Sequence, residues 1–404
     1  MSAKRVWRKH RSDRLITILT FVLMALGLIV IYAIGPMRAN ALGVENENTF
    51  VIHQIISVAV SVVAFVVAFR LPYTKVRKYA KILLVVGLVA CALLAVLALV
   101  GSGLAKCELG ACRWYNLGAT VSLQPAEILK LGLVMYLAQM VAQKRREGKL
   151  ESWSEFWLPY AVVCGLSLFF VVIVQKDLGT GVSLIAIMMA ILWMSGVSLK
   201  KFAIACGVIL LAGVVAIVSS PHRMERLTTY GGEGDDAASY HLDNAMMAIG
   251  SGGLTGVGIG NSVQATGYLP ESINDSVFAV MGETFGFVGL VIIVGCFTIL
   301  LMRLLGTANG LPTEPALVVV GVFAWVGSQV IVNIAAMTGI VPLTGITLPL
   351  LNYGGTSMIF TAAALGVCSQ LSCYTGRKVE EQNENISSRW GVGGTHHPSR
   401  RRSA

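Results

Sequence analysis

Charged side chains are scarce in this chain of 404 residues. Asp, Glu, Lys and Arg make up 13% of the residues, whereas hydrophobic residues make up 55%. A soluble domain carries about 25% charged residues, so the composition excludes an ordinary soluble protein. Apolar runs, each near the ~20 residues that span a bilayer, recur along the sequence. They predict an all-α polytopic membrane protein, and their continuity excludes an outer-membrane barrel, whose strands alternate in polarity.

Several signatures of soluble catalysts are also missing. The sequence has no Walker lysine motif, no Cys/His spacing typical of a metal site and no nucleophile elbow. Glycines 256, 258 and 260 form a GxGxG pattern, but it lacks the strand, turn and helix of a dinucleotide site. ATP-driven transport therefore has no support in the sequence, and we expect no organic cofactor.

The apolar runs predict about ten transmembrane helices. They cover residues 15–35, 51–69, 82–100, 126–141, 157–175, 179–194, 202–218, 277–302, 316–337 and 358–373. We divide the chain into a basic cytoplasmic tail (1–14), a transmembrane domain (15–375) and a disordered cytoplasmic tail (376–404). Within the domain, residues 219–275 form a long extracellular loop between the seventh and eighth helices, and we expect a short interfacial helix at 240–250.

The net charge of +10 reflects where the basic residues stand. They gather in both tails and in short loops near residues 75–78, 144–146 and 200–201. This pattern follows the positive-inside rule, which places both termini in the cytoplasm. It predicts no nucleic-acid partner.

Two of the eight cysteines differ from the rest. Cys107 and Cys112 flank the sequence ELGA in a predicted outside loop. In an oxidising compartment they could form a disulfide, and two free thiols explain the sequence equally well. The other six lie in or beside apolar runs, where we expect inert packing.

The acidic residues around the start of the eighth predicted helix are the main functional candidates. Glu271, Asp275 and Glu283 lie where the long loop enters the membrane. Carboxylates are costly beside hydrocarbon, so an ionisable residue there points to function. The alternative for Asp275 is a structural one, namely that it caps the helix.

Four other groups of polar residues fall at the same predicted outer face, and each has a structural alternative. Glu127 and Lys130, at i and i+3, either form a buried ion pair or line a cavity. Asp177 is either a helix cap or a site residue.

The remaining groups also have both a functional and a structural interpretation. Arg223 and Arg226 either bind phosphate or snorkel at the interface. The glycines of the turn Tyr353-Gly354-Gly355 could serve only for their backbone freedom. Arg113, Lys176 and the long loop complete the set of polar candidates.

Together these motifs resemble the SEDS family, the membrane glycosyltransferases FtsW and RodA. The resemblance extends from about residue 15 to residue 373 and rests on several motifs in order: QPAE, QKDLGT, HRMERL, AIGSGGLTGVGIGNS, LPESINDSVFAVMGE and PLTGITLPLLNYGGTS. It implies a bundle of about ten helices. It also implies polymerisation of lipid II, undecaprenyl-diphosphate-linked disaccharide pentapeptide, into glycan strands.

The resemblance places the family's essential aspartate at Asp275, as a proton acceptor or a cation ligand. It implies that a divalent cation, Mg²⁺ or Mn²⁺, supports the reaction, although no metal ligands are identified. The implied substrate-binding residues are Arg113, Glu127, Lys130, Lys176, Asp177, Arg223, Arg226, Glu283, Tyr353, Gly354 and Gly355. The implied partners are a class B penicillin-binding protein, which is a transpeptidase, and other division proteins.

The chain departs from the family pattern at a few positions. Lys176 stands where proline is usual, His241 where glutamine is common, and Thr284 replaces a second glutamate. The ITLPLLNYGG turn and the NDS around Asp275 favour an FtsW-like septal enzyme over a RodA-like elongation polymerase. A lipid II flippase and a non-catalytic division scaffold remain alternatives. We expect a multi-pass protein of the bacterial plasma membrane, at the division septum.

Overall fold

The computed structural model describes residues 11–108, 111–116, 118, 122–218 and 236–374. Among these residues, nine helices are long and apolar enough to cross a membrane. The main helices are α1 (Arg14–Ala41), α2 (Thr49–Arg70), α3 (Tyr73–Lys78), α4 (Ala80–Leu99), α5 (Pro125–Arg146), α6 (Leu158–Leu168), α7 (Leu178–Ser195), α8 (Leu199–Val218), α10 (Asp236–Ser251), α11 (Val277–Asn309), α12 (Thr313–Met337) and α13 (Gly355–Leu371). Two π-helical turns, Trp153–Trp157 and Phe169–Val174, flank α6 and extend it to membrane-spanning length.

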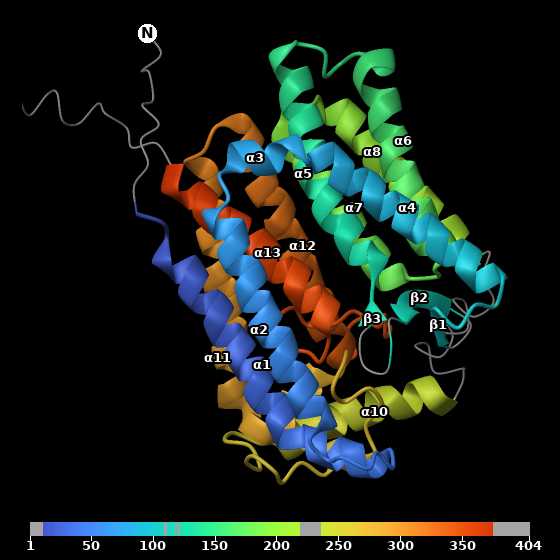
Figure 1. Ribbon diagram of the computed structural model, residues 1–404, viewed down its shortest axis with the longest axis vertical. Coiled ribbons are helices and arrows are strands. Elements are labelled where there is room, and N and C mark those ends of the chain that lie inside the picture. Colours follow the sequence, from blue (N-terminus) through green and yellow to red (C-terminus); the bar gives the residue numbers. More distant parts are fainter. Residues whose placement is uncertain (1–10, 109–110, 117, 119–121, 219–235, 375–404) are drawn as a thin grey trace, which may run out of the picture.

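The predicted spans agree with this architecture. Nine of them fall on the nine apolar helices, and the predicted span 202–218 falls within α8. The expected short helix at 240–250 lies within α10, which crosses the lower end of the bundle in Figure 1. A small antiparallel sheet, which was not predicted from the sequence, consists of β1 (Ala105–Glu108), β2 (Ala111–Asn116) and β3 (Ser122–Leu123).

Helices α5, α12 and α13 form the interior of the bundle. Their most apolar windows are 72%, 72% and 78% buried, compared with 22% for α2 and α4, which face outward. Helix α12 packs against α5, α7, α11 and α13. Because lipid provides no hydrophobic force between helices, this close packing and the polar contacts described below hold the bundle together.

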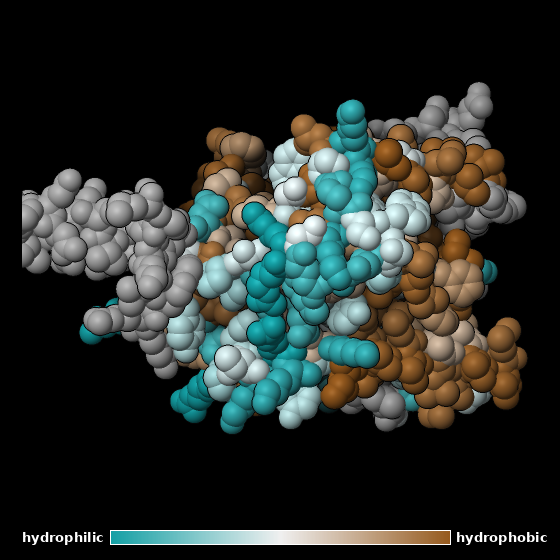
Figure 2. Space-filling model, turned by 90° about the horizontal axis from the view of Figure 1, so that it is seen from above, coloured by the Kyte–Doolittle hydropathy of each residue, from teal (hydrophilic) through white to brown (hydrophobic). Residues whose placement is uncertain are grey.

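The basic loops and both described ends of the chain share one face of the bundle. The N–H of Asp13 donates to the Ser372 hydroxyl at 2.8 Å, which joins the start of α1 to the end of α13. The Gln370 amide donates to the Leu71 carbonyl in the turn before α3, at the top of Figure 1. Figure 2 shows this face, with hydrophilic residues in a band across its middle and hydrophobic residues on its flanks. The basic loops thus gather on one face, and its position on the cytoplasmic side stays a prediction of the positive-inside rule.

Helix α11 is interrupted at Gly286, which has φ 66° and ψ −169°. The break frees the carbonyls of residues 283 and 284 and the N–H groups of residues 287 and 288. The glycine-rich segment 252–258 pairs with all of them: Val257 N to Glu283 O (2.9 Å), Gly258 N to Thr284 O (3.1 Å), Phe287 N to Gly253 O (2.9 Å) and Val288 N to Leu254 O (3.1 Å). Backbone groups near the membrane must be satisfied within the protein. The segment therefore replaces the hydrogen bonds that the helix has lost.

Candidate active site at the helix ends opposite the basic loops

Asp275 lies in the turn that leads into α11, on the side of the bundle opposite the basic loops. The side-chain amide of Asn333 in α12 donates to the Asp275 carbonyl at 2.7 Å and to the Ile346 carbonyl at 2.7 Å. Asn333 is buried, so neither bond competes with bulk water. One amide group thus joins α12, the Asp275 turn and the segment that follows α12.

The segment after α12 runs beside the Asp275 carboxylate. A β-carbon placed on Gly345 would lie 4.0 Å from Asp275 Oδ2, so the backbone there passes close to the acid. Further on, the N–H of Tyr353 donates to the Ile273 carbonyl at 2.7 Å. The Asp275 turn is therefore held from two sides, by Asn333 and by the NYGG turn.

Asp177 approaches the same segment from α7. Its carboxylate accepts from the Thr180 N–H (3.0 Å), the Thr180 hydroxyl (2.8 Å) and the Gln124 amide (3.1 Å). The helix-cap interpretation of Asp177 is thus correct. A β-carbon on Gly179 would lie only 2.6 Å from Ile346 Cγ1, so this position needs glycine. The structure therefore brings the Asp177 and Asp275 motifs to a shared segment, residues 344–346.

Arg113 and Lys176 meet at the turn before Asp177. Lys176 has a positive φ of 53°, which is unusual for a residue with a side chain. Its carbonyl accepts a hydrogen bond from Arg113 Nη2 at 2.8 Å. The Lys176 side chain is exposed. This corner of the site therefore carries two cationic groups next to a carboxylate that is already hydrogen-bonded.

Glu127 and Lys130 form the ion pair that their spacing predicted. Lys130 Nζ lies 2.7 Å from Glu127 Oε1, and both side chains are buried. The ammonium group also lies 4.7 Å from the centre of the Trp325 ring in α12, a cation–π distance. Gln124, which binds Asp177, immediately precedes α5. The pair therefore lies within the first two turns of that helix, at the end opposite the basic loops.

The turn Tyr353-Gly354-Gly355 connects the site to α2. The Tyr353 hydroxyl lies 3.0 Å from His53 Nδ1, and burial raises the pKa of this phenol, which stays protonated. Gly354 has an extended φ of 169°, and Gly355 is not among the glycines with positive φ. Backbone freedom is therefore the wrong explanation for these two glycines. A β-carbon on Gly355 would lie 3.0 Å from Ser57 Oγ in α2, which indicates close packing.

Glu283 is occupied by the loop rather than open to a ligand. Its carboxylate accepts from the Ser262 hydroxyl (2.5 Å), from the Val263 N–H (2.8 Å) and from the Gln264 N–H (3.3 Å). It is 2% exposed. These contacts assign Glu283 to anchoring the segment that follows the glycine-rich one. Binding of substrate by this residue stays a prediction without support from its geometry.

Two further predicted ligands, Arg223 and Arg226, lie outside the described residues. Within the described ranges, no group of three or more His, Cys, Asp or Glu side chains could hold a metal ion. The role of Asn333 was not predicted from the sequence. A lone asparagine in an apolar span was the available signal, because an amide in a membrane helix needs partners there.

The chain matches a known family over nearly its whole length. The cell cycle protein family that comprises FtsW, RodA and SpoVE matches residues 13–377. Stage V sporulation protein E of Bacillus subtilis is 32% identical over 372 residues, which are 91% of this chain and 99% of that protein. A probable peptidoglycan glycosyltransferase FtsW of Halomonas elongata is 32% identical over 397 residues, covering 95% and 96% of the two chains.

Solved structures share the fold. A chain from a peptidoglycan synthase complex superposes with a TM-score of 0.70 at 22% identity, covering 89% of this chain and 97% of that one. The rod shape determining protein RodA of Thermus thermophilus gives a TM-score of 0.64 at 23% identity, covering 89% and 96%. Sequence and fold agree: the chain is a multi-pass membrane protein that belongs to the FtsW, RodA and SpoVE family.

Proposed function

We propose that this protein is a peptidoglycan glycosyltransferase that polymerises lipid II, with Asp275 as the proton acceptor. The observation that carries the proposal is the position of Asp275. Asn333 fixes its backbone, and its carboxylate lies beside Gly345, on the face opposite the basic loops. Relatives named probable peptidoglycan glycosyltransferase FtsW, at about 30% identity over most of the chain, support the same activity.

The reaction joins two lipid-linked saccharides. The 4-hydroxyl oxygen of the acceptor attacks the anomeric carbon of the donor, the bond from that carbon to the lipid diphosphate breaks, and the diphosphate leaves with the bonding electrons. The hydroxyl proton passes to the Asp275 carboxylate. A positioned general base contributes about 10²–10⁴-fold to such a step. The predicted phosphate ligands Arg223 and Arg226 lie outside the described residues, and the cationic groups of Arg113 and Lys176 lie beside Asp177.

A divalent cation fits this site only in part. The Asp177 carboxylate already accepts hydrogen bonds from Thr180 and Gln124, so Asp275, the aspartate that the family resemblance marks, is the candidate ligand. Mg²⁺ is commonly held by one or two carboxylates together with substrate phosphate and water. When bound in this way, with the lipid diphosphate, the ion would neutralise the leaving group.

Purified protein in detergent tests the proposal directly. It should convert lipid II into glycan polymer, visible by gel electrophoresis, and Asp275→Ala should abolish the polymer while the protein still folds. Glu271→Gln is the matched control, because Glu271 is an exposed carboxylate in the same turn whose partner is Asn274. Polymer formed at an unchanged rate by Asp275→Ala would refute the assigned role.

The cellular setting is part of the same proposal. The relatives named FtsW favour a septal role over RodA-like elongation, and the fold shared with a chain of a peptidoglycan synthase complex supports a class B penicillin-binding protein as partner. By the positive-inside rule, the face with Asp13 and Arg77 lies in the cytoplasm of the bacterial cell, which places both tails there. Depletion followed by fluorescence microscopy separates the roles, since loss of a septal enzyme gives filaments and loss of an elongation enzyme gives rounded cells.

A lipid II flippase is the second candidate. The buried Glu127–Lys130 pair is the kind of intramembrane polar group that transporters use. However, it lies near the outer end of α5, and not at the midplane where transport sites lie. Vesicles with labelled lipid II in one leaflet decide between the two: translocation without polymer would favour the flippase.

A further inference from the structure

The hairpin formed by β1 and β2 contains a bulge at Arg113. Cys107 pairs with Cys112, whereas Lys106 pairs with Trp114. Arg113 is therefore the extra residue on β2, without a counterpart on β1. A bulge of this kind bends the strand and redirects a side chain.

The redirected side chain reaches the candidate active site. Arg113 Nη2 donates to the Lys176 carbonyl at 2.8 Å, and its Nε atom is buried. Lys176 is held in the left-handed region, with φ 53°, immediately before Asp177 caps α7. The bulge is thus connected to Asp177 through one hydrogen bond and the Lys176–Asp177 peptide bond.

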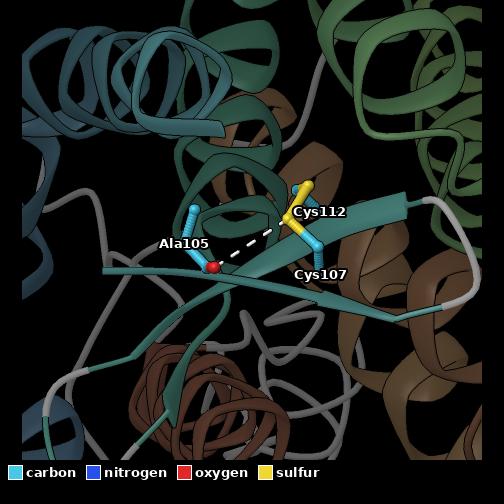
Figure 3. The surroundings of a disulfide bond; sticks show 3 residues. All are labelled: Ala105, Cys107 and Cys112. Atoms are coloured by element: carbon cyan, nitrogen blue, oxygen red, sulfur yellow. Dashed lines mark hydrogen bonds between the residues drawn. A yellow bond between two sulfur atoms is a disulfide. The ribbon is translucent and has the colours of Figure 1, made fainter. Parts of the chain in front are cut away.

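A disulfide lies directly beside the bulge. Cys107 and Cys112 are bonded, with their Cα atoms 4.0 Å apart, and Figure 3 shows the bond bridging the two strands. The Cys107 sulfur also lies 3.8 Å from the Ala105 carbonyl oxygen. Because a disulfide sulfur carries no proton, this approach is a contact and not a hydrogen bond. The bond ties together the two residues that define the register next to Arg113.

Other contacts hold the part of β2 beyond the bulge: Tyr115 pairs with Leu123 of β3, and its hydroxyl donates to the Ala90 carbonyl in α4. Strand β1 has four residues and pairs with β2 at the edge of the sheet, so the disulfide is its covalent tie on the Cys112 side of the bulge. On the other side of the bulge, Lys106 Nζ lies 6.0 Å from the Trp114 ring, a weak contact at this distance. A shift of β1 along β2 on the Cys112 side would close or move the bulge, and the bulge sets the direction of the Arg113 side chain. Arg113 would then lose its position against the Lys176 carbonyl.

We propose that the Cys107–Cys112 disulfide locks the hairpin register so that Arg113 holds the Lys176–Asp177 turn in place for catalysis. This inference rests on the proposed function. Cys107 and Cys112 are positioning residues in this account, since they act through Arg113 and touch no substrate. The basic loops lie on the opposite face, so the bond faces the side where an oxidising compartment can maintain it.

The experiment compares oxidised and reduced protein. A water-soluble phosphine reduces the disulfide to two thiols and is itself oxidised to the phosphine oxide with oxygen from water. N-ethylmaleimide then traps both thiols, and mass spectrometry confirms the change. Reduction should lower kcat for lipid II polymerisation about tenfold, the cost of one hydrogen bond to a charged group, with KM nearly unchanged.

Two variants make the test specific. Cys107→Ser with Cys112→Ser keeps the other cysteines and should have low activity that reduction no longer alters. Arg113→Ala should show the same low kcat, and reduction should not lower it further, because both changes remove one contact. Equal activity of oxidised and reduced wild type, or effects of reduction and Arg113→Ala that multiply, would overturn the inference.

Hydrogen exchange separates this inference from the proposed function. If the wild-type protein makes no polymer in either redox state, the proposed function fails, and amide exchange still tests the lock. The inference predicts that reduction accelerates exchange in residues 111–116 and also in 176–180. Faster exchange confined to the hairpin would show that the disulfide does not control the Lys176–Asp177 turn.

Discussion

The side-chain nitrogen of Asn333 has two hydrogens and donates both, one to the carbonyl of Asp275 and one to the carbonyl of Ile346. The group that fixes the proposed catalytic residue therefore comes from α12, the helix at the centre of the bundle. The Asp275 turn, the segment that follows α12 and the core of the bundle form one unit through this contact.

We expect Asn333→Ala to slow lipid II polymerisation about tenfold or more, because two buried carbonyl groups lose their donor. Asn333→Asp should be worse than Asn333→Ala, since a carboxylate cannot donate and repels both oxygens. Ser328→Ala, in the same helix, removes only a bond to the Trp325 carbonyl and serves as control. If all three variants polymerise at equal rates, Asn333 does not position Asp275.

The buried ion pair gives a prediction about stability. Glu127→Gln or Lys130→Met alone should lower the free energy of unfolding by about 3–5 kcal/mol, because each leaves a buried charge without its partner. Combining them should recover much of that loss. Thermal unfolding in detergent measures the effect.

Polymerisation by the double variant then distinguishes the two interpretations of the pair. A folded and active double variant would show that the pair is structural. A folded but inactive one would show that the charges also serve the reaction.

The break in α11 predicts that replacing glycine with alanine destabilises the protein at Gly286 but not at another glycine of the same helix. A β-carbon at Gly286 would lie 2.3 Å from the Gly256 nitrogen, and the residue also has a positive φ. Gly286→Ala should therefore destabilise the protein by more than the ~1–3 kcal/mol typical of strained backbone alone. Gly295→Ala, where nothing lies within 4 Å, should be neutral or slightly stabilising. Equal melting temperatures for the two variants would contradict this explanation of the break.

Glu283 gives a prediction about the loop. Glu283→Gln keeps the size of the side chain but replaces one acceptor oxygen with a donor, facing the N–H groups of Val263 and Gln264. We expect faster hydrogen exchange in residues 257–266 and slower polymerisation with an unchanged KM. A higher KM with unaltered exchange would instead indicate that Glu283 binds substrate.

The sequence predicted the membrane helices well because their signal is local. A run of about twenty apolar residues identifies a span without knowledge of its neighbours. The i, i+3 spacing of Glu127 and Lys130 likewise predicted their ion pair, since one helix supplies both residues.

Contacts between segments that are far apart in the sequence could not be predicted from local patterns. The pairing of segment 252–258 with the break at Gly286 depends on backbone groups, which leave no pattern of side chains. The roles of Asn333 and Glu283 depend on partners 58 and 20 residues away. The register of the Cys107–Cys112 hairpin depends on tertiary contacts, so spacing alone left the disulfide open.

The most direct test of the central claim is the single-turnover rate of glycan formation by Asp275→Asn. This change keeps the shape of the side chain and the backbone carbonyl that Asn333 holds, and it removes only the proton acceptor. We predict that lipid II still binds and that the rate falls by about 100-fold or more. A rate equal to that of the wild type would contradict the account.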